Sequence, residues 1–491
     1  MKQSNSIIVM GIVLCVILGL LVIWKENSGG DAAAKTHDLQ EEKNDSIDDK
    51  DREEGNIDIN TNDININETN SNDIKDSDSK EKAEKAAAEN RDIAVEKLSY
   101  YQQYLSGLGS DKTLMEFVNH LEERYGEEVV KKLAEDDGTC DIKKAFYEMT
   151  GNSVFVELDE FLGNGDYRFT IDSEQSDARI TFAGDVCLEE DGFVIDHYDT
   201  TAGLSECISP SILAYTNAAD VFMLNNEFSF SDRGEPLRGK MYTFRAMPER
   251  VSILKELGTD VVSLANNHVY DYGPEAFSDT ISCLDRAGIV HVGGGNNQAE
   301  AEKVAYLNVN GIKIGIISAS RAEKIRYTPQ AGQDTPGIFL MYEPERFLTL
   351  TRNASECCDY LVAFIHWGTE DSRYYEAYQH DLAKNIFDAG ADIIIGAHPH
   401  VLQGMEYIDG KPVIYSLGDF WFNGETKYTT FVAIDIGVDR LNSVRVFPCL
   451  QSNYTTTLIE EESEKLAFMQ YLRGLSASLS ISDEGILIPS E

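Results

Sequence analysis

Short apolar runs alternate with helical patterns from Arg179 onward, and this alternation restricts the possible folds more than any other feature of the chain. The apolar runs lie at residues 180–183, 221–224, 261–264, 361–365 and 393–395. Because the runs are predominantly apolar and do not alternate with polar residues, we expect strands that are buried on both faces. The helical patterns at 249–257, 275–287 and 378–389 are each followed by a glycine, which is typical of a helix C-cap. This order predicts an α/β domain of layered sheets.

Two turn signals add antiparallel strands to this domain. Asn310-Gly311 and Asp409-Gly410 are each flanked by strand-like runs, and such dipeptides fit the two-residue turn of a β-hairpin. We therefore expect sheets with both parallel and antiparallel strands in the main domain, which we place at residues 178–450.

The N-terminal segment has a different composition. Residues 7–24 form an uncharged apolar run that is long enough to cross about 30 Å of hydrocarbon as a helix. We expect residues 1–25 to be the transmembrane anchor of a single-pass cell-membrane protein whose C-terminal domain is extracytoplasmic. A cleavable signal peptide is the alternative, but the run continues into Lys25 without a small-residue cleavage site.

Three further segments complete the predicted organisation. Residues 26–95 are dominated by Asp, Asn, Glu, Lys and Ser, so we expect a disordered acidic linker that cannot bury enough apolar surface to fold. Apolar residues recur at three- and four-residue spacing within 96–150, which predicts a helical region over residues 96–170. We expect residues 451–491 to form a C-terminal helical extension or tail.

The net charge excludes one class of partner. The chain has 42 Lys and Arg against 85 Asp and Glu, a net charge of −43, and nucleic acid binding depends on cationic neutralisation of phosphates. The same charge repels an anionic polymer unless a local cationic pocket or a bound metal reverses the field. Lys240 and Arg245 are candidates for such a pocket and, with Asn226, for substrate binding. The alternative is an exposed loop whose cations pair with local acids.

Each predicted strand leads into polar residues of types that bind metals. In chain order these are Asp185, the pair Asn226 and Glu227, the run Asn266-Asn267-His268, His366, and the pair His398 and His400. Ligand sites of open α/β sheets lie at the carboxyl ends of the strands, so we expect these loops to meet in one crevice. Oxygen and imidazole donors suit divalent metals. A single such residue is more often a helix cap or a structural histidine, but five loops together favour a functional site.

Seven motifs carry a resemblance to a known family. They are Phe182-Ala183-Gly184-Asp185, Asn225-Asn226-Glu227, Lys240-Met241-Tyr242-Thr243-Phe244-Arg245, Leu264-Ala265-Asn266-Asn267-His268, His366-Trp367-Gly368, Gly396-Ala397-His398-Pro399-His400-Val401 and Ser416-Leu417-Gly418-Asp419-Phe420. In these motifs and their order the chain resembles the CapA family of poly-γ-glutamate capsule proteins, which is related to the calcineurin-like metallophosphoesterases. The resemblance implies a metallophosphoesterase-like α/β sandwich, and it does not cover residues 1–170.

The resemblance also implies a ligand set. Similarity to metallophosphoesterases implies one or two divalent metal ions (Mn, Zn or Mg) bound by Asp185, Asn267, His366, His398 and His400, with Glu227 where that superfamily has a bridging Asp. The same similarity makes His268 the general acid beside the leaving group, since an imidazole can donate a proton near neutral pH.

Two positions depart from the expected pattern. Asp185-Val186-Cys187 lacks the Asp-x-His pair of metallophosphoesterases, and Asp419 stands where the family usually has Asn. Either the site holds fewer metals, or Asp419 adds a carboxylate to the metal ligands.

The family resemblance implies a role in making, exporting or anchoring an anionic capsule polymer, with poly-γ-glutamate or its synthase complex as partner. Our first hypothesis is a metal-dependent hydrolase or transferase that acts on a phosphoester or a γ-glutamyl amide. The second is a non-catalytic assembly subunit that binds polymer or synthase through the same crevice. The third is a surface-binding module whose linker and helical region recruit partners.

Overall fold

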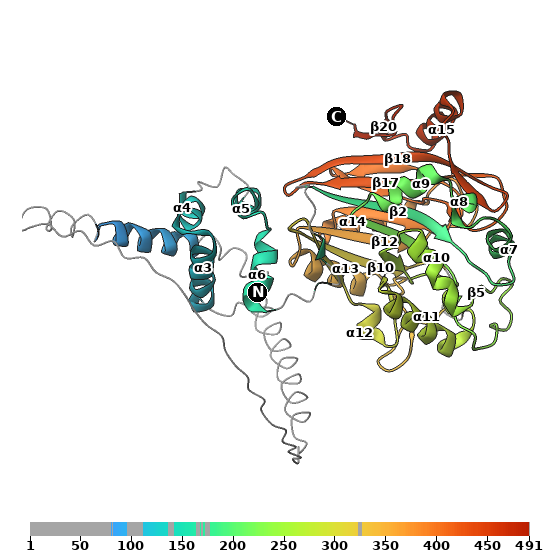
Figure 1. Ribbon diagram of the computed structural model, residues 1–491, viewed down its shortest axis with the longest axis horizontal. Helices are drawn as coiled ribbons and strands as arrows, with labels where there is room; N and C mark the ends of the chain where they lie inside the picture. The colour runs from blue at the N-terminus through green and yellow to red at the C-terminus, as the bar shows by residue number, and fades with distance from the viewer. Residues whose placement is uncertain are drawn as a thin grey trace, which may run out of the picture. The chain divides into compact units, whose positions relative to one another are not determined.

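Two stacked β-sheets with helices on their outer faces form the main domain (Figure 1). The computed structural model describes residues 80, 82–95, 111–135, 142–163, 167, 170–171, 177–322 and 327–490. The predicted layered α/β sandwich is confirmed for the main domain. The expected anchor at residues 1–25 and most of the expected linker lie outside the described residues.

The first sheet has eight strands and combines a parallel part with an antiparallel part. In spatial order the strands are β19 (Thr455–Leu458), β18 (Leu441–Ser452), β17 (Lys427–Ile436), β2 (Ala178–Val186), β3 (Val221–Asn226), β6 (Val261–Ser263) and β7 (Val290–Val292), with β16 (Asp419–Trp421) paired to β2. Strands β2, β3, β6 and β7 run parallel. Their carboxyl ends therefore share one edge of the sheet.

The second sheet has seven strands. In spatial order they are β1 (Thr170–Ile171), β9 (Ala305–Val309), β10 (Ile312–Ser320), β12 (Tyr360–His366), β13 (Ile393–Ala397), β15 (Lys411–Ile414) and β14 (Met405–Ile408). Strands β10, β12, β13 and β15 run parallel. The hairpins β9–β10 and β14–β15 form at the two predicted turns, where Asn310, Gly311, Asp409 and Gly410 all have positive φ, as a type I′ turn requires.

Three apolar layers hold the sandwich together. Between the sheets, side chains such as Phe182, Met223 and Val362 form one buried cluster. Outside the first sheet lie α7 (Phe193–Thr200), α8 (Leu204–Cys207), α9 (Pro210–Asn217), α10 (Val251–Glu256) and α11 (Gly273–Ala287), and outside the second lie α13 (Glu345–Ser355) and α14 (Ala377–Asp388). Because the central strands are covered on both faces, their sequences are predominantly apolar, as predicted.

Short elements join these layers. They are β4 (Ser229–Phe230), β5 (Arg245–Ala246), the 3₁₀ helix η1 (Pro248–Arg250), β8 (Gly294–Gly295), α12 (Gln298–Ala301), β11 (Gly337–Ile338), β20 (Leu479–Ile481) and β21 (Leu487–Pro489). β4 and β5 lie in the segment between β3 and α10, and they pair with each other in parallel. Their pairing positions the chain from Ser229 to Ala246 beside the carboxyl edge of the first sheet.

The described N-terminal region is helical, and four of its helices lie between residues 111 and 162. They are α3 (Asp111–Tyr125), α4 (Glu127–Glu135), α5 (Ile142–Thr150) and α6 (Val154–Leu162). Leu114, Phe117, Val118 and Leu121 lie on one buried face of α3, as their spacing predicts. Residues 82–95 are also helical, although the sequence analysis assigned them to the linker. Their alanines have a high helix propensity, and Ala94 packs into the same cluster.

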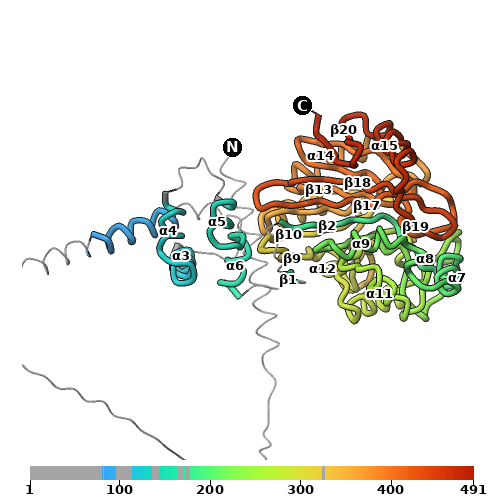
Figure 2. The backbone as a smooth tube through the Cα atoms, turned by 45° about the horizontal axis from the view of Figure 1, so that its top comes forward, coloured from blue at the N-terminus to red at the C-terminus, as the bar shows by residue number. Residues whose placement is uncertain are grey.

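The C-terminal segment is part of the sandwich and is not a separate tail. β19 pairs with β18 at the edge of the first sheet, and α15 (Glu462–Leu475) packs Phe468 and Leu472 into the core between the sheets. In Figures 1 and 2, α15 lies beside β20 at the C-terminal end of the chain. The domain therefore continues past residue 450, where the sequence analysis placed its end.

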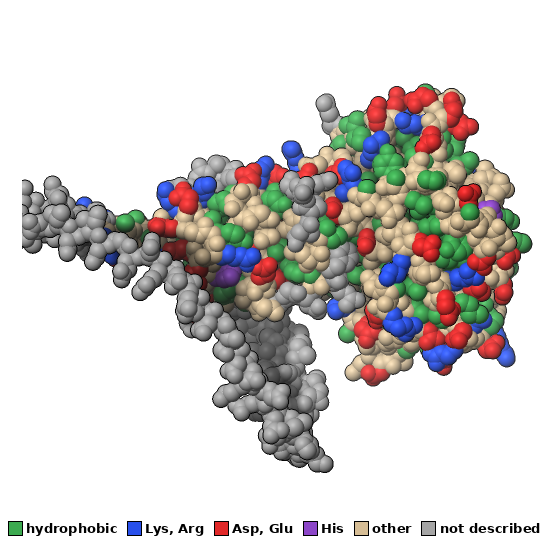
Figure 3. All heavy atoms as spheres, viewed as in Figure 1, with side chains coloured by type: hydrophobic (Ala, Val, Ile, Leu, Met, Phe, Trp, Pro, Cys, Tyr) green, Lys and Arg blue, Asp and Glu red, His purple; other side chains and the backbone are tan. Residues whose placement is uncertain are grey.

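Surface charge and helix length add two observations. Acidic side chains are interspersed with Lys and Arg over the visible face of the described residues, and the basic side chains there do not gather in one patch (Figure 3). No helix within the described residues is both long and apolar enough to cross a membrane.

Candidate metal centre

The carboxyl ends of strands from both sheets meet at one site. In the first sheet Asp185 at the end of β2 is paired in register with Asn225 of β3 and with Asp419 of β16. In the second sheet His366 ends β12 opposite Ala397 of β13, and the loop after β13 begins at the next residue. The predicted convergence of strand ends is therefore observed.

A glycine permits the close approach of two of these segments. A Cβ atom on Gly184 would lie 1.9 Å from the carbonyl oxygen of Gly418. The Asp185 amide donates a hydrogen bond to that same carbonyl, at 3.0 Å. Only a residue without a side chain lets the Asp419 loop lie this close to β2.

Two asparagine amides orient the buried carboxylates. Asn225 Nδ2 donates to Asp185 Oδ1 at 2.7 Å and to Glu227 Oε2 at 3.0 Å. Asn266 Nδ2 donates in turn to Asn225 Oδ1 at 3.0 Å. The amide of Asn225 therefore holds two carboxylates side by side, and it leaves their other oxygens free of this contact.

Three overlapping groups of side chains have ligand atoms close enough to hold a metal ion. The groups are Asp185, Glu227 and His366; Glu227, His398 and His400; and Asp185, His400 and Asp419, and within each group the ligand atoms lie within 4.8 Å of one another. Asn267 joins them through its Oδ1 atom, which lies 2.8 Å from His366 Nε2. Each group shares a residue with the other two, so the arrangement suits two neighbouring ions or one ion between them.

The donor set fits a divalent cation. Glu227 Oε1 and His398 Nδ1 are buried and have no hydrogen-bond partner among the described residues. Such atoms are costly to bury unless something compensates them. Both are atoms that ligate metals, and carboxylate with imidazole is the donor combination of zinc and manganese sites.

The backbone that presents two of the histidines is strained. His398 has φ of 99° and His400 has φ of 57°, in the left-handed region that residues with a side chain rarely adopt. Strain of this kind costs about 1–3 kcal/mol per residue and gathers at functional sites. Here it turns both imidazoles of the loop after β13 toward the carboxylates of the first sheet.

Burial and mutual charge shift the pKa values of the cluster in opposite directions. Burial raises the pKa of Asp185 and raises that of Glu227 well above the usual range, while it holds the pKa of His366 and of His398 well below theirs. Burial also acts against charge on His400, but the nearby carboxylates of Asp419 and Glu227 outweigh it and raise the pKa of this imidazole well above its usual value. A metal would compete with these protons, because ligation requires ionised carboxylates and neutral imidazoles.

His268 stands beside the metal groups with its own supporting network. Its Nδ1 atom lies 2.7 Å from Asp271 Oδ2, and Asp271 also accepts from Lys240 Nζ at 2.6 Å and from the amide of Phe244 at 2.9 Å. Burial lowers the pKa of His268. Since Nδ1 is bound to Asp271, Nε2 is the atom left to exchange a proton with a ligand.

The three predicted substrate-binding residues have other partners in the structure. Lys240 is half-buried, and its Nζ atom donates to Asp271, the partner of His268, and to the carbonyl of Asn267. The guanidinium of Arg245 lies over the ring of Tyr272, 4.1 Å from its centroid. Asn226 Nδ2 donates to the carbonyl of Phe228 at 2.7 Å. The seven predicted metal ligands and His268 come together, whereas these three do not line the adjacent cavity.

Sequence reasoning missed some residues of the site. Asn225 and Asn266 were part of recognised motifs but had no assigned role, and Asp271 was not singled out. The signal for Asp271 is its position three residues after His268, which lets the two side chains meet within a tight turn. Cys187 lines the cavity but belongs to none of the three metal groups.

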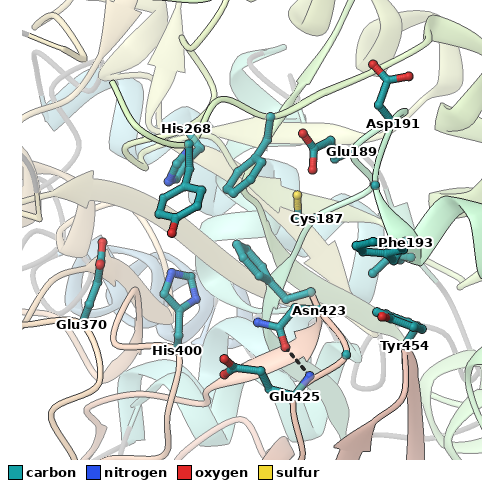
Figure 4. Close-up of a pocket in the computed structure, with 16 residues that line it drawn as sticks. Cys187, Glu189, Asp191, Phe193, His268, Glu370, His400, Asn423, Glu425 and Tyr454 are labelled. Carbon is teal, nitrogen blue, oxygen red and sulfur yellow. Dashed lines mark hydrogen bonds between the residues drawn. The ribbon is translucent and has the colours of Figure 1, made fainter. Parts of the chain in front are cut away.

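A cavity of about 610 Å³ opens beside the cluster (Figure 4). His268 and His400 both line it, and both lie on the same side of the view. The rest of the lining comes from the segment after β2, the segment before β5, the segment between β12 and α14, and the segments around β16 and β19. Figure 4 labels the acidic side chains Glu189, Asp191, Glu370 and Glu425 around this space.

Comparison with known proteins gives consistent matches for the main domain. Residues 179–424 match the family model described as bacterial capsule synthesis protein PGA_cap. The PGA biosynthesis protein CapA of Bacillus subtilis (strain 168) is 36% identical over 176 residues, which is 36% of this chain and 46% of that protein. The capsule biosynthesis protein CapA of Bacillus anthracis is 37% identical over 185 residues, covering 36% of this chain and 44% of that protein. The chain thus spans about half the length of these curated relatives.

Solved structures match only loosely. A hypothetical protein from Thermus thermophilus has a TM-score of 0.35 at 14% identity, covering 56% of this chain and 99% of that one. A putative 5'-nucleotidase from Staphylococcus aureus in complex with alpha-ketoglutarate also has a TM-score of 0.35, at 16% identity, covering 60% of this chain and 58% of that one. Scores at this level carry no weight for the fold or the function.

Proposed function

Because the chain belongs to the PGA_cap family of bacterial capsule synthesis proteins, we propose that it is a metal-dependent hydrolase or transferase with a role in poly-γ-glutamate capsule synthesis. The names of the Bacillus relatives support the capsule role. The three overlapping ligand groups, with two unpartnered ligand atoms in them, support the chemistry. That second observation carries the proposal, since packing alone does not account for it.

In the proposed reaction, separate residues bind the cation and transfer the proton. When bound, a divalent cation supplies Lewis-acid polarisation of a phosphoryl or carbonyl oxygen. Asp185, Glu227 and the histidines of the second sheet would hold that cation. In its imidazolium form, which Asp271 favours against the effect of burial, His268 would donate the Nε2 proton to the leaving group. With the cation bound, the site would combine an electrophile with an oriented acid, which the hydrolysis of a phosphoester or of a γ-glutamyl amide requires.

Metal content of the full-length protein tests this function. We expect one or two equivalents of Mn, Zn or Mg in the native chain by elemental analysis, and loss of that metal and of hydrolysis in a His398→Ala/His400→Ala variant. A His380→Ala variant is the matched control, because His380 contacts Glu406 away from the cluster. Native protein that stays folded and binds none of the three metals would contradict the proposal.

A second candidate is a non-catalytic assembly subunit that binds the polymer or its synthase through the same crevice. The observation that favours it is Cys187, which occupies the second position of the Asp-x-His pair and contributes to none of the ligand groups. Capsule formation in cells separates the two candidates. Folded protein with the His398→Ala/His400→Ala change should fail to support capsule if catalysis is needed, and should still support it in the assembly role.

We further propose that residues 1–25 anchor the chain in the cell membrane and leave the main domain extracytoplasmic. The uncharged run at residues 7–24 supports this arrangement. Protease added to intact protoplasts should then remove the main domain while leaving the anchor in the membrane. Protection of the main domain until the membrane is lysed would contradict the proposed orientation.

A further inference from the structure

The cavity beside the metal centre has an unusual charge for a protein of anionic polymer metabolism. Its lining includes the carboxylates of Glu189, Asp191, Glu370 and Glu425, and neither a lysine nor an arginine of the described residues lines it. In Figure 4, Glu189 and Asp191 lie on one side of the space and Glu370 lies on the other, beside His400. A carboxylate of a polyglutamate chain would be repelled from such a surface.

Two lysines near the cavity are paired with acidic side chains. Lys427 Nζ lies 2.6 Å from Glu425 Oε2 and 3.6 Å from Asp419 Oδ2, so it neutralises one lining carboxylate from behind. Lys240 is bound to Asp271, the partner of His268. The other lining acids therefore still make the electrostatic potential in the cavity negative. Burial, together with the charge of Asp191, raises the pKa of Glu189.

Aromatic rings form the other part of the lining. Phe193 is 70% exposed and Tyr242 is 63% exposed, and the ring of Phe193 stacks on Tyr454 with centroids 5.6 Å apart. Deeper in the cavity, Phe244 meets Phe422 edge to face, also at 5.6 Å between centroids. Exposed rings gathered around a cavity mark a contact surface. Their faces attract cations, which the nearby carboxylates attract as well.

We propose that this cavity binds an ammonium group on the substrate, adjacent to the bond that reacts at the metal centre. Carboxylates and ring faces together form the kind of site that recognises alkylammonium ligands. The inference rests on the proposed function, because it names the part of the substrate that lies next to His268 and His400. The anionic part of the substrate then lies toward the metal, and the cationic part lies toward Phe193 and Glu189.

A matched pair of esters tests this directly on the full-length, Mn-loaded protein. 4-Nitrophenyl phosphorylcholine and 4-nitrophenyl 3,3-dimethylbutyl phosphate have the same leaving group and nearly the same shape, but only the first carries a positive charge. We expect kcat/KM to favour the cationic ester by about tenfold or more, the factor that a desolvated cation–π and carboxylate contact provides. Equal values for the two esters would overturn the inference while leaving the metal-dependent hydrolase in place.

Variants connect that preference to the cavity. Glu189→Gln/Asp191→Asn should reduce the ratio of the two kcat/KM values to about one. Glu206→Gln/Asp334→Asn makes the same charge change at exposed residues outside the cavity and should retain the full preference. A preference that survives in the first variant, or disappears in the second, would overturn the assignment to this surface.

A binding measurement keeps the inference testable if neither ester is hydrolysed. Saturation-transfer NMR should detect choline, but not the uncharged 3,3-dimethylbutanol, and the signal should disappear in Glu189→Gln/Asp191→Asn. Binding without turnover would sustain the ammonium site and count against the hydrolase. If choline, lysine amide and glucosamine all fail to bind, the proposed ammonium site is wrong. If they bind, the ligand with the highest affinity shows whether the ammonium belongs to a head group, a side chain or a sugar.

Discussion

At the residue scale, a carboxylate outside the metal centre makes the stability of the fold depend on pH. Asp260 precedes β6, and its Oδ2 atom accepts a hydrogen bond from the amide of Phe222 at 2.8 Å. Burial raises the pKa of Asp260 to about 6, whereas a carboxylate in the unfolded chain has a pKa of about 3.9. The folded state therefore binds more protons than the unfolded state between these two values. Stability must decrease as pH rises across that interval.

Replacement of Asp260 by Asn should remove this pH dependence. Asn keeps an acceptor for the Phe222 amide but has no charge to bury, so the variant should gain roughly 1–3 kcal/mol in free energy of unfolding, relative to wild type, as pH rises from 4 to above 6. Denaturant unfolding at pH 4, 5, 6 and 7 measures the difference. Asp196→Asn, at an exposed residue of α7, serves as control. A difference between Asp260→Asn and wild type that stays constant with pH would contradict the assignment.

Gly184 provides a second test at a single residue. A methyl group there would lie 1.9 Å from the Gly418 carbonyl, so Gly184→Ala must separate β2 from the Asp419 loop. We expect a loss of about 2–4 kcal/mol in unfolding free energy, together with weaker metal binding, by calorimetry. Gly474→Ala is the opposite case: it lies in α15 with open space around it, so it should add about 0.5–1 kcal/mol. Equal effects of the two changes would show that the close approach is not needed.

At the scale of single elements, the loop after β6 shows how one turn supports a proposed acid. Asp271 joins His268, Lys240 and the Phe244 amide, so Asp271→Asn should misorient the imidazole without removing it. We expect kcat to decrease by about 10²–10⁴-fold with little change in KM. Asp271→Glu should recover part of the rate. If KM rises while kcat is unchanged, Asp271 acts on substrate binding instead of on His268.

Element boundaries and long-range partners differ in how well sequence predicts them. The central strands and both hairpins were predicted because burial on both faces and the Asn-Gly and Asp-Gly turns are local signals. Ligands at strand ends followed from the parallel sheet order. Other contacts depend on segments far apart in the sequence or on loop geometry. They are the pairing of β19 with β18, the stacking of Arg245 on Tyr272 and the hydrogen bond from Lys240 to Asp271. No periodicity or spacing encodes these contacts, so the sequence left open whether Lys240 and Arg245 bind substrate or pair with neighbouring groups.

At the scale of the whole molecule, the metal centre lies across the seam between the two sheets. Asp185, Glu227 and Asp419 come from the first sheet, and the three histidines of the ligand groups come from the second. A bound cation would therefore link the two halves of the sandwich. Ligands that bind only the folded state stabilise it by mass action, by about 2.7 kcal/mol at a free concentration 100 times Kd.

Thermal unfolding should report this linkage independently of any catalytic assay. Adding Mn²⁺ or Zn²⁺ to chelator-treated, full-length protein should raise Tm by several degrees, and EDTA should reverse the change. Asp419→Asn removes one carboxylate of a three-residue group while leaving the other two groups intact, so it should weaken metal affinity about 10–100-fold and shift the midpoint of the Tm response to higher metal concentration. His398→Ala/His400→Ala changes two of the three ligand groups and should abolish the increase in Tm on metal addition. A Tm increase that persists in this double variant would place the stabilising ion elsewhere, and the two sheets would then be held together by their apolar core alone.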